Sequence, residues 1–259
     1  TFEMTNTNAK KRTVVPKLRF PEFREAEAWN QMALGSVCEL RAGKFVEASD
    51  IAETPGVDLF PCYGGNGLRG YTRTYTHEGQ YTLIGRQGAL CGNVRQFDGK
   101  FHATEHALVV NPIDSIKRDW LFYTLGLLDL NQYAIGQAQP GLSVQVLEKI
   151  SAFVPPVPEE QQRIADCLTS LDELIAAQGR KVEALKTYKR SLMQQLFPRE
   201  GETVPRLRFP EFRNAPGWKP KALGAIVEIA SGQVDPSASP FRDMLHVGGE
   251  NIESNLGRI

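Results

Sequence analysis

Residues 15–24 read VPKLRFPEFR, and residues 204–213 read VPRLRFPEFR, with one conservative difference between them. The offset is 189 residues, and the similarity continues in that register without a gap. A period of this length is far too long for a solenoid and indicates two whole modules that begin alike. We call residues 15–29 the first repeat segment and residues 204–218 the second repeat segment. The further matched pairs are Trp29 and Trp218, Ala33 and Ala222, Leu34 and Leu223, Gly35 and Gly224, Glu39 and Glu228, and Gly43 and Gly232.

The similarity ends abruptly after Gly43 and Gly232. The following residues, GKFVEASDIAETPG in the first module, have no counterpart in GQVDPSASPFRDML in the second. A plain tandem duplication of one structural domain predicts likeness inside the modules as well. A shared frame around different interiors instead favours two sites that recognise different things.

The composition is that of a globular protein, because 41% of the 259 residues are hydrophobic and 23% are charged. No run approaches the roughly eighteen apolar residues of a membrane-spanning helix. Residues 1–14 lack the apolar run of a signal peptide and are expected to form a loose tail. Four cysteines without CxxC or zinc-type spacing favour reduced thiols in the cytoplasm. They are Cys38, Cys62, Cys91 and Cys167.

The predicted fold class is α+β. Short alternating runs bounded by glycines over residues 59–111 predict a β-rich region with many loops. Residues 120–130 have a helical apolar pattern, and prolines break regular structure at residues 155–158. We expect a β-rich domain over residues 15–157, a long helix over residues 158–198, and the incomplete start of a second module over residues 199–259.

The long helix is predicted from Glu159 to Phe197, between two prolines. At about 1.5 Å per residue it is about 60 Å long. Its heptad positions alternate by three and four residues, and seven of the nine are apolar, which predicts a coiled-coil seam. The alternative is a helix that packs only on its own domain. The apolar seam residues are Leu168, Leu171, Ile175, Val182, Leu185, Leu192 and Leu196, and the other two positions are Gln178 and Lys189.

Charge on this helix is polarised, with the first half mainly acidic and the second half mainly basic. A polarised helix pairs best with a like helix that runs antiparallel, because each acidic half then meets a basic half. We therefore expect an antiparallel coiled coil. The acidic residues are Glu159, Glu160, Asp166, Asp172 and Glu173, and the basic ones are Arg180, Lys181, Lys186, Lys189, Arg190 and Arg199.

Two short motifs are weighed and rejected. His102 and His106 fit an H-x-x-E-H zinc pattern, but the flanking residues predict a strand rather than the helix that this pattern requires. Residues 65–70 match G-x-G-x-x-G, but a β-type run follows the glycines where a dinucleotide site needs a helix. No catalytic signature stands out, so we expect neither catalytic residues nor a metal site.

The loops of the β-rich region carry residue types that suit DNA. Arginine and lysine suit guanine edges and phosphates, and asparagine and glutamine suit adenine. Neighbouring glycines would let the backbone approach a ligand closely. The alternative is an ordinary polar loop surface, and the zero net charge of the chain counts mildly against nucleic-acid binding. The candidate DNA contacts are Asn66, Arg69, Tyr71, Arg73, Arg86, Gln87, Asn93 and Arg95, with Gln137 and Gln139 from the loop at residues 136–143.

Five stretches together resemble the specificity subunit of type I restriction–modification systems. They are PKLRFPEF at residues 16–23, IGQAQPGLS at 135–143, VLEKI at 146–150, VPPVPEEQQRI at 154–164 and LKTYKRSLMQQLF at 185–197. The resemblance implies that each half of such a subunit has a variable target-recognition domain and a conserved helix. Each recognition domain reads one part of a split DNA site, and the two helices pack antiparallel to set the spacing.

The resemblance also implies the partners and the compartment. Methyltransferase and motor–nuclease subunits would bind this frame and carry the chemistry with S-adenosylmethionine, ATP and magnesium, so this chain itself would bind no cofactor. A prokaryotic cytoplasmic location is expected, with no membrane contact. Two alternatives stay open: the recognition part of a single-chain restriction–methylation enzyme, and a coiled-coil scaffold that binds no DNA.

The sequence departs from the family pattern in length. The second recognition region begins near Ile226 and has too few residues for a complete domain, and a second long helix is missing. The apolar seam therefore lacks the partner that the family supplies. We expect a homodimer in which each long helix replaces the other's missing repeat and which reads a symmetric site.

Overall fold

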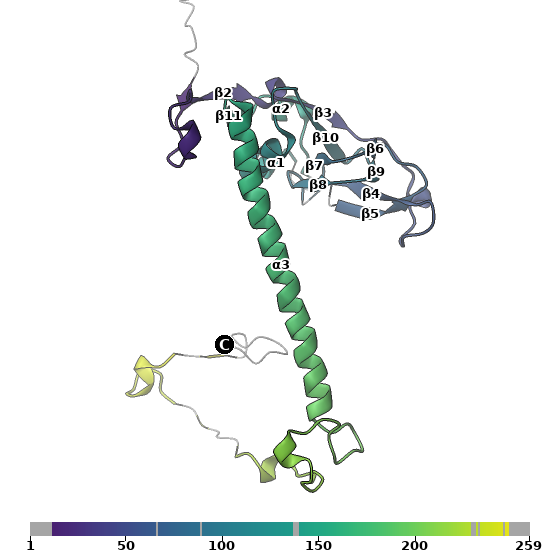
Figure 1. Ribbon diagram of the computed structural model, residues 1–259, viewed down its shortest axis with the longest axis vertical. Coiled ribbons are helices and arrows are strands. Elements are labelled where there is room, and N and C mark those ends of the chain that lie inside the picture. The colour runs from purple at the N-terminus through teal and green to yellow at the C-terminus, as the bar shows by residue number, and fades with distance from the viewer. Residues whose placement is uncertain are drawn as a thin grey trace, which may run out of the picture. The chain divides into compact units, whose positions relative to one another are not determined.

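The computed structural model describes residues 12–65, 67–88, 90–136, 140–228, 232, 234–245 and 247–248. The chain divides into two compact units, Thr1–Gly179 and Arg180–Ile259, which are described separately here. Three sheets and the helices α1 and α2 belong to the first unit, and the long helix α3 starts there (Figure 1). The mixed α+β class predicted from the sequence is confirmed.

The central sheet has four antiparallel strands in the order β3-β10-β7-β8. Successive residues of a strand point to opposite faces, and here both faces are buried. In β10, Leu108 and Val110 belong to the larger core, whereas Ala107 and Val109 belong to a smaller core on the other face. This is why the strand reads as a continuous apolar run. The strands are β3 (Cys38–Ala42), β7 (Tyr81–Gly85), β8 (Val94–Phe97) and β10 (Ala107–Pro112).

The second sheet covers the smaller core and has the order β5-β4-β9-β6. Aromatic rings fill the space between the two sheets: Tyr63 stacks on Phe97 with ring centroids 3.7 Å apart, and Phe101 is fully buried beside them. His77 stacks on Phe101, and its burial lowers the pKa of its imidazole, with the charges of His102 and Lys44 acting in the same direction. The strands are β4 (Phe60–Gly64), β5 (Gly67–Thr72), β6 (His77–Glu78) and β9 (Lys100–Ala103).

The third sheet joins the start of the described chain to the segment before the long helix. It has the order β1-β2-β11, with strands β1 (Thr13–Val14), β2 (Trp29–Ala33) and β11 (Ser151–Val154). The predicted loose tail over residues 1–14 is therefore wrong at its end, because β1 pairs with β2. Residues 1–11 lie outside the described part.

Three α-helices complete the first unit. The helix predicted over residues 120–130 is α1, Arg118–Leu127, and it packs Trp120 and Leu121 into the larger core. It ends earlier than predicted, because Asp129 adopts a left-handed φ of 45°. The segment before β11 contains α2, Val144–Leu147, whose N-cap is Ser143. The predicted long helix is confirmed to within one residue at each end as α3, Pro158–Leu196.

The first turns of α3 are fixed to the domain by buried polar contacts. Gln161, 1% exposed, accepts a hydrogen bond from the Lys117 backbone N–H at 2.8 Å and donates to the Pro155 carbonyl at 3.0 Å. Glu160, also 1% exposed, accepts from Arg19. These contacts join the helix start to the beginning of α1 and to the first repeat segment.

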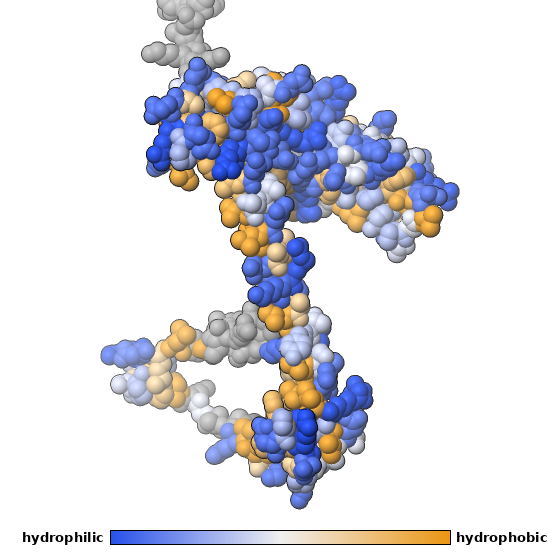
Figure 2. Space-filling view, in the orientation of Figure 1, coloured by the Kyte–Doolittle hydropathy of each residue, from blue (hydrophilic) through white to orange (hydrophobic). Residues whose placement is uncertain are grey.

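Most of α3 beyond its first turns is exposed. The seam residues Leu171, Ile175, Val182 and Leu185 are each about half or more exposed, and Figure 2 shows hydrophobic surface along the helix. Leu168, Leu192 and Leu196 are half-buried. An exposed apolar stripe at heptad spacing is typical of a helix that forms a coiled coil with a second helix. No helix of the described residues is long and apolar enough to cross a membrane.

The second unit repeats the local structure of the first repeat segment. A 3-10 turn at Pro210–Phe212 matches the one at Pro21–Phe23, and Leu223–Ala225 matches Leu34–Ser36. Residues 218–222, which correspond to β2, form no strand. In the first unit β2 is paired along its length by β11, and the described residues of the second unit contain no counterpart of β11. Further 3-10 turns are Ala48–Asp50, Leu130–Tyr133 and Phe241–Asp243.

Replacing Gln161 with alanine is expected to loosen the start of α3. The change leaves the buried Lys117 N–H and Pro155 carbonyl without partners, so the free energy of unfolding should fall by about 1–3 kcal/mol. The control Gln162→Ala, which loses one hydrogen bond to Asp166, should change it by about 0.5 kcal/mol or less. Urea titration of both variants measures the difference, and equal midpoints would contradict the assigned role of Gln161.

Candidate nucleic-acid interface

Four loops meet at one end of the two larger sheets. Their described residues are 64, 65 and 67 in the β4–β5 turn, 86–88 and 90–93 in the β7–β8 loop, 104–106 in the β9–β10 turn, and 136, 140 and 141 in the loop before α2. We call them the loop cluster. Backbone hydrogen bonds join the last three: Arg86 N–H donates to the His106 carbonyl at 2.9 Å, Leu142 N–H to the Arg86 carbonyl, and Gly88 N–H to the Pro140 carbonyl.

Glycine allows the first loop to approach the others. A Cβ atom on Gly65 would lie 2.7 Å from the Gln87 carbonyl oxygen and 2.9 Å from that of His106. Those are backbone atoms, so no side chain could move aside to make room. Gly67, with a φ of 97°, makes the turn that starts β5. The β4–β5 turn therefore packs directly against the two neighbouring loops.

Three arginines border the loop cluster: Arg86 belongs to the β7–β8 loop, Arg69 to β5 and Arg95 to β8. The Arg69 side chain lies against Gly64, and Arg95 Nη1 lies 3.3 Å from where a Cβ of Gly67 would be. Arg86 Nη1 donates to the Glu105 carbonyl at 3.5 Å. Arg69 and Arg95 are exposed and Arg86 is half-buried. Three of the arginines predicted from the sequence are thus brought together.

Glu105 and His106 add an acid and an imidazole to the same place. Glu105 Oε1 lies 3.0 Å from His106 Nε2, while its Oε2 is buried and has no hydrogen-bond partner among the described residues. Neither residue is among the DNA contacts predicted from the sequence. The unsatisfied carboxylate oxygen shows why Glu105 belongs with the arginines as a candidate for binding a hydrogen-bond donor.

The HATEH stretch at residues 102–106 runs from the end of β9 into the turn before β10, so the predicted strand in place of a helix is confirmed, and its two histidines have separate partners. His102 is buried in β9, with Nδ1 3.2 Å from Thr74 Oγ1 and Nε2 3.1 Å from the Lys44 carbonyl oxygen. Within the described ranges, no three His, Cys, Asp or Glu side chains are grouped as metal ligands. The G-x-G-x-x-G stretch likewise forms the β4–β5 hairpin.

The comparisons with known proteins agree with this geometry. The family model of the type I restriction modification DNA specificity domain matches residues 26–187. The chain belongs to this family. It is 46% identical over 154 residues to the type I restriction enzyme EcoprrI specificity subunit of Escherichia coli, covering 59% of this chain and 38% of that protein. It is 31% identical over 116 residues to a putative specificity subunit of Haemophilus influenzae, covering 43% and 30%.

A solved structure shows the same fold. The S subunit of a type I restriction–modification system from M. genitalium matches with a TM-score of 0.58 at 20% identity, over 67% of this chain and 46% of that one. The chain spans less than half the length of each of these relatives. The matched specificity domain contains the loop cluster and most of α3, and the second repeat segment lies beyond it.

Within the specificity domain, the other predicted contacts that the structure describes divide between the loop cluster and the far end of β5. Tyr71 and Arg73 lie at the far end of β5, because Gly67 pairs with Gly64 and Thr72 pairs with Phe60 at opposite ends of the hairpin. Gln87 and Asn93 belong to the β7–β8 loop. Asn66, Gln137 and Gln139 lie outside the described residues.

Proposed function

We propose that this chain is the DNA-reading, non-catalytic part of a type I restriction–modification complex. Membership of the specificity-domain family is the observation that carries the proposal, and the arginine-bearing loop cluster supports it. Methyl transfer and cleavage would belong to methyltransferase and motor–nuclease subunits, which would use S-adenosylmethionine, ATP and magnesium. The chain itself would position these subunits and select the DNA sequence.

The loop cluster has the chemistry to read base edges. An arginine can bind the O6 and N7 atoms of guanine with two hydrogen bonds, and a carboxylate can accept from the amino group of cytosine. Arg69, Arg86 and Arg95 supply the donors, and the partly exposed carboxylate of Glu105 supplies an acceptor. The zero net charge of the chain does not oppose binding, because these three arginines stand beside one acidic side chain. Any of these arginines that does not bind a base edge would bind a phosphate oxygen of the DNA backbone.

Replacing Arg69 or Arg86 with alanine should weaken DNA binding by about 1–3 kcal/mol each if the side chain reads a base. The measurement is fluorescence anisotropy of labelled duplexes with the chain assembled with its methyltransferase subunit, at low salt, where phosphate contacts are strongest. Arg242→Ala, which changes an exposed arginine outside α3 and the loop cluster, is the control and should leave the affinity unchanged. Unaltered affinity in both Arg69→Ala and Arg86→Ala would refute the assigned contacts, and no binding by the unmodified chain would favour a scaffold.

We also propose that the chain self-associates through α3. The exposed seam supports this, because burial of its apolar side chains stabilises a helix pair at roughly 25 cal/mol for each Å² removed from water. The polarity of charge favours the antiparallel arrangement, in which Asp172 and Glu173 of one helix approach the basic half of the other. Such a pair would carry two loop clusters related by twofold symmetry.

Cysteine cross-linking distinguishes the orientations. With Cys167 replaced by serine, chains carrying Ile175→Cys should cross-link to chains carrying Val182→Cys, because an antiparallel pair centred between Gln178 and Gly179 sets these positions opposite each other. A parallel pair would link each variant only to itself. Light scattering at micromolar concentration should give the mass of a dimer, and a monomer would contradict the self-association.

A further inference from the structure

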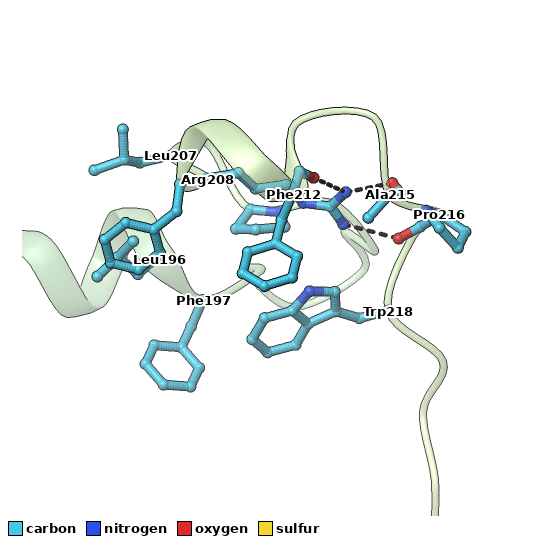
Figure 3. A pocket seen from close by; sticks show the side chains of 10 residues that line it. Leu196, Phe197, Leu207, Arg208, Phe212, Ala215, Pro216 and Trp218 are labelled. Carbon is cyan, nitrogen blue, oxygen red and sulfur yellow. Dashed lines mark hydrogen bonds between the residues drawn. The ribbon is translucent and has the colours of Figure 1, made fainter.

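Two arginines of this chain have guanidinium groups that are held by several oxygen atoms. Arg19 pairs with the buried carboxylate of Glu160 and also donates to two backbone carbonyls of the first repeat segment. Arg208, at the equivalent place in the second repeat segment, donates to three backbone carbonyls of its own segment (Figure 3). A guanidinium held in this way supports the local fold.

Arg69 and Arg95 have different surroundings. Both side chains are exposed, and within the described ranges neither forms an ion pair or a side-chain hydrogen bond. Their donors are therefore available to a ligand. Arg95 Nη1 lies 3.3 Å from the place where a Cβ atom of Gly67 would be, so the guanidinium that β8 carries reaches the start of β5.

Strand pairing places Leu68 beside the reach of Arg95. Arg95 pairs with Leu83 in the central sheet, and Leu68 pairs with Tyr63 in the second sheet. Residues that pair directly across two strands share a face of the sheet, and both Leu83 and Tyr63 belong to the smaller core between the sheets. Because β5 and β8 are edge strands, Arg95 and Leu68 lie at the margin of that core, where side chains meet water.

Leu90 brings a second exposed leucine to this margin. Its carbonyl oxygen lies 2.8 Å from the place where a Cβ atom of Gly85 would be, and the carbonyl oxygen of Gly65 lies closer still to the same point. The β7–β8 loop is therefore packed against the β4–β5 turn. The Leu90 carbonyl also accepts from the Asn93 N–H at 3.2 Å, just before β8 begins.

The two leucines differ in exposure from the core leucines of the same domain. Leu68 is 53% and Leu90 43% exposed, whereas Leu83 and Leu108 are at most 3% exposed. Single exposed leucines are common on protein surfaces. Here two of them lie at one margin together with an arginine whose donors are available. We call Leu68, Leu90 and Arg95 the leucine–arginine group.

We propose that the leucine–arginine group reads a thymine next to a guanine in the major groove of DNA. Arginine can bind the O6 and N7 atoms of guanine, and the 5-methyl group of thymine is the feature of the groove that an apolar side chain contacts. Arg95 would supply the first contact, and Leu68 and Leu90 the second. The proposal rests on the DNA-reading function proposed above and adds to it the kind of base pair that is read.

The apolar side chains favour a base edge over the DNA backbone as the ligand. Contacts to phosphates carry no sequence information, and a leucine offers a phosphate no hydrogen-bond donor. Leu68 and Arg95 also belong to strands, and side chains on regular elements are placed more precisely than those on loops. Such placement serves discrimination between bases.

Uracil tests the methyl contact, because it lacks only the 5-methyl group of thymine. The chain is assembled with its methyltransferase subunit, and each thymine of the half-site that it selects, on either strand, is replaced in turn by uracil. Fluorescence anisotropy should show a position at which uracil weakens binding about fourfold, the factor that burial of one methyl group supplies. That thymine should lie next to a guanine whose replacement by 7-deazaguanine, which lacks N7, also weakens binding.

Variants connect these effects to the leucine–arginine group. The double variant Leu68→Ala, Leu90→Ala should bind the thymine and uracil duplexes equally, and Arg95→Ala should abolish the effect of 7-deazaguanine. The double variant Leu68→Met, Leu90→Met keeps an apolar surface and should keep the preference for thymine. Leu127→Ala, which shortens an exposed leucine of α1, is the control and should also keep it.

The readout is a ratio of two affinities of the same protein, so partial unfolding of a variant lowers both affinities and leaves the ratio unchanged. The thymine contact is overturned by a half-site without thymine, by equal binding of uracil at every position, or by a preference for thymine that persists in Leu68→Ala, Leu90→Ala. In each of these results the unmodified chain still binds DNA, and the proposed function stands. Absence of DNA binding by the unmodified, assembled chain would contradict both.

Discussion

The ion pair between Arg19 and Glu160 connects the first repeat segment to the first turn of α3. Its partners are 141 residues apart, and both side chains are almost completely shielded from water. Breaking such a pair by removing one partner leaves a buried charge uncompensated. Together with Gln161 and the pairing of β2 with β11, the pair fixes where α3 leaves the recognition domain. These contacts therefore hold the first turns of α3 against the first unit.

The loop cluster depends on a different constraint, the burial of both faces of the central sheet. Because one face packs on α1 and α3 and the other on the second sheet, the four loops at the end of the sheets are held by two cores. Loops supported in this way can vary in sequence without loss of the frame. It agrees with a repeat whose shared residues lie in the segment that precedes each interior and whose interiors differ.

Much of the frame could be predicted from sequence because its signals are local. Pro158 and Pro198 delimit α3, and the run at residues 107–110 marks a strand buried on both faces. The features that the sequence did not predict depend on contacts between residues far apart in the chain. Thr13 and Val14 were predicted to belong to a loose tail, because only their pairing with β2 makes them a strand. Glu160 was predicted to be one of the acidic residues of the coiled-coil helix, because its partner Arg19 lies far away in sequence. Among the candidate contacts, residue type alone could not separate Arg69, Arg86 and Arg95, which converge, from Tyr71 and Arg73, which lie at the other end of β5.

We propose that two copies of one recognition domain are held together by an antiparallel pair of α3 helices. Selection of bound duplexes from a random-sequence pool, with the chain assembled with its methyltransferase subunit, measures this most directly. The account predicts a split site in which two identical half-sites are inverted and separated by a spacer of constant length. A single half-site, two unlike half-sites, or half-sites in the same orientation would contradict it.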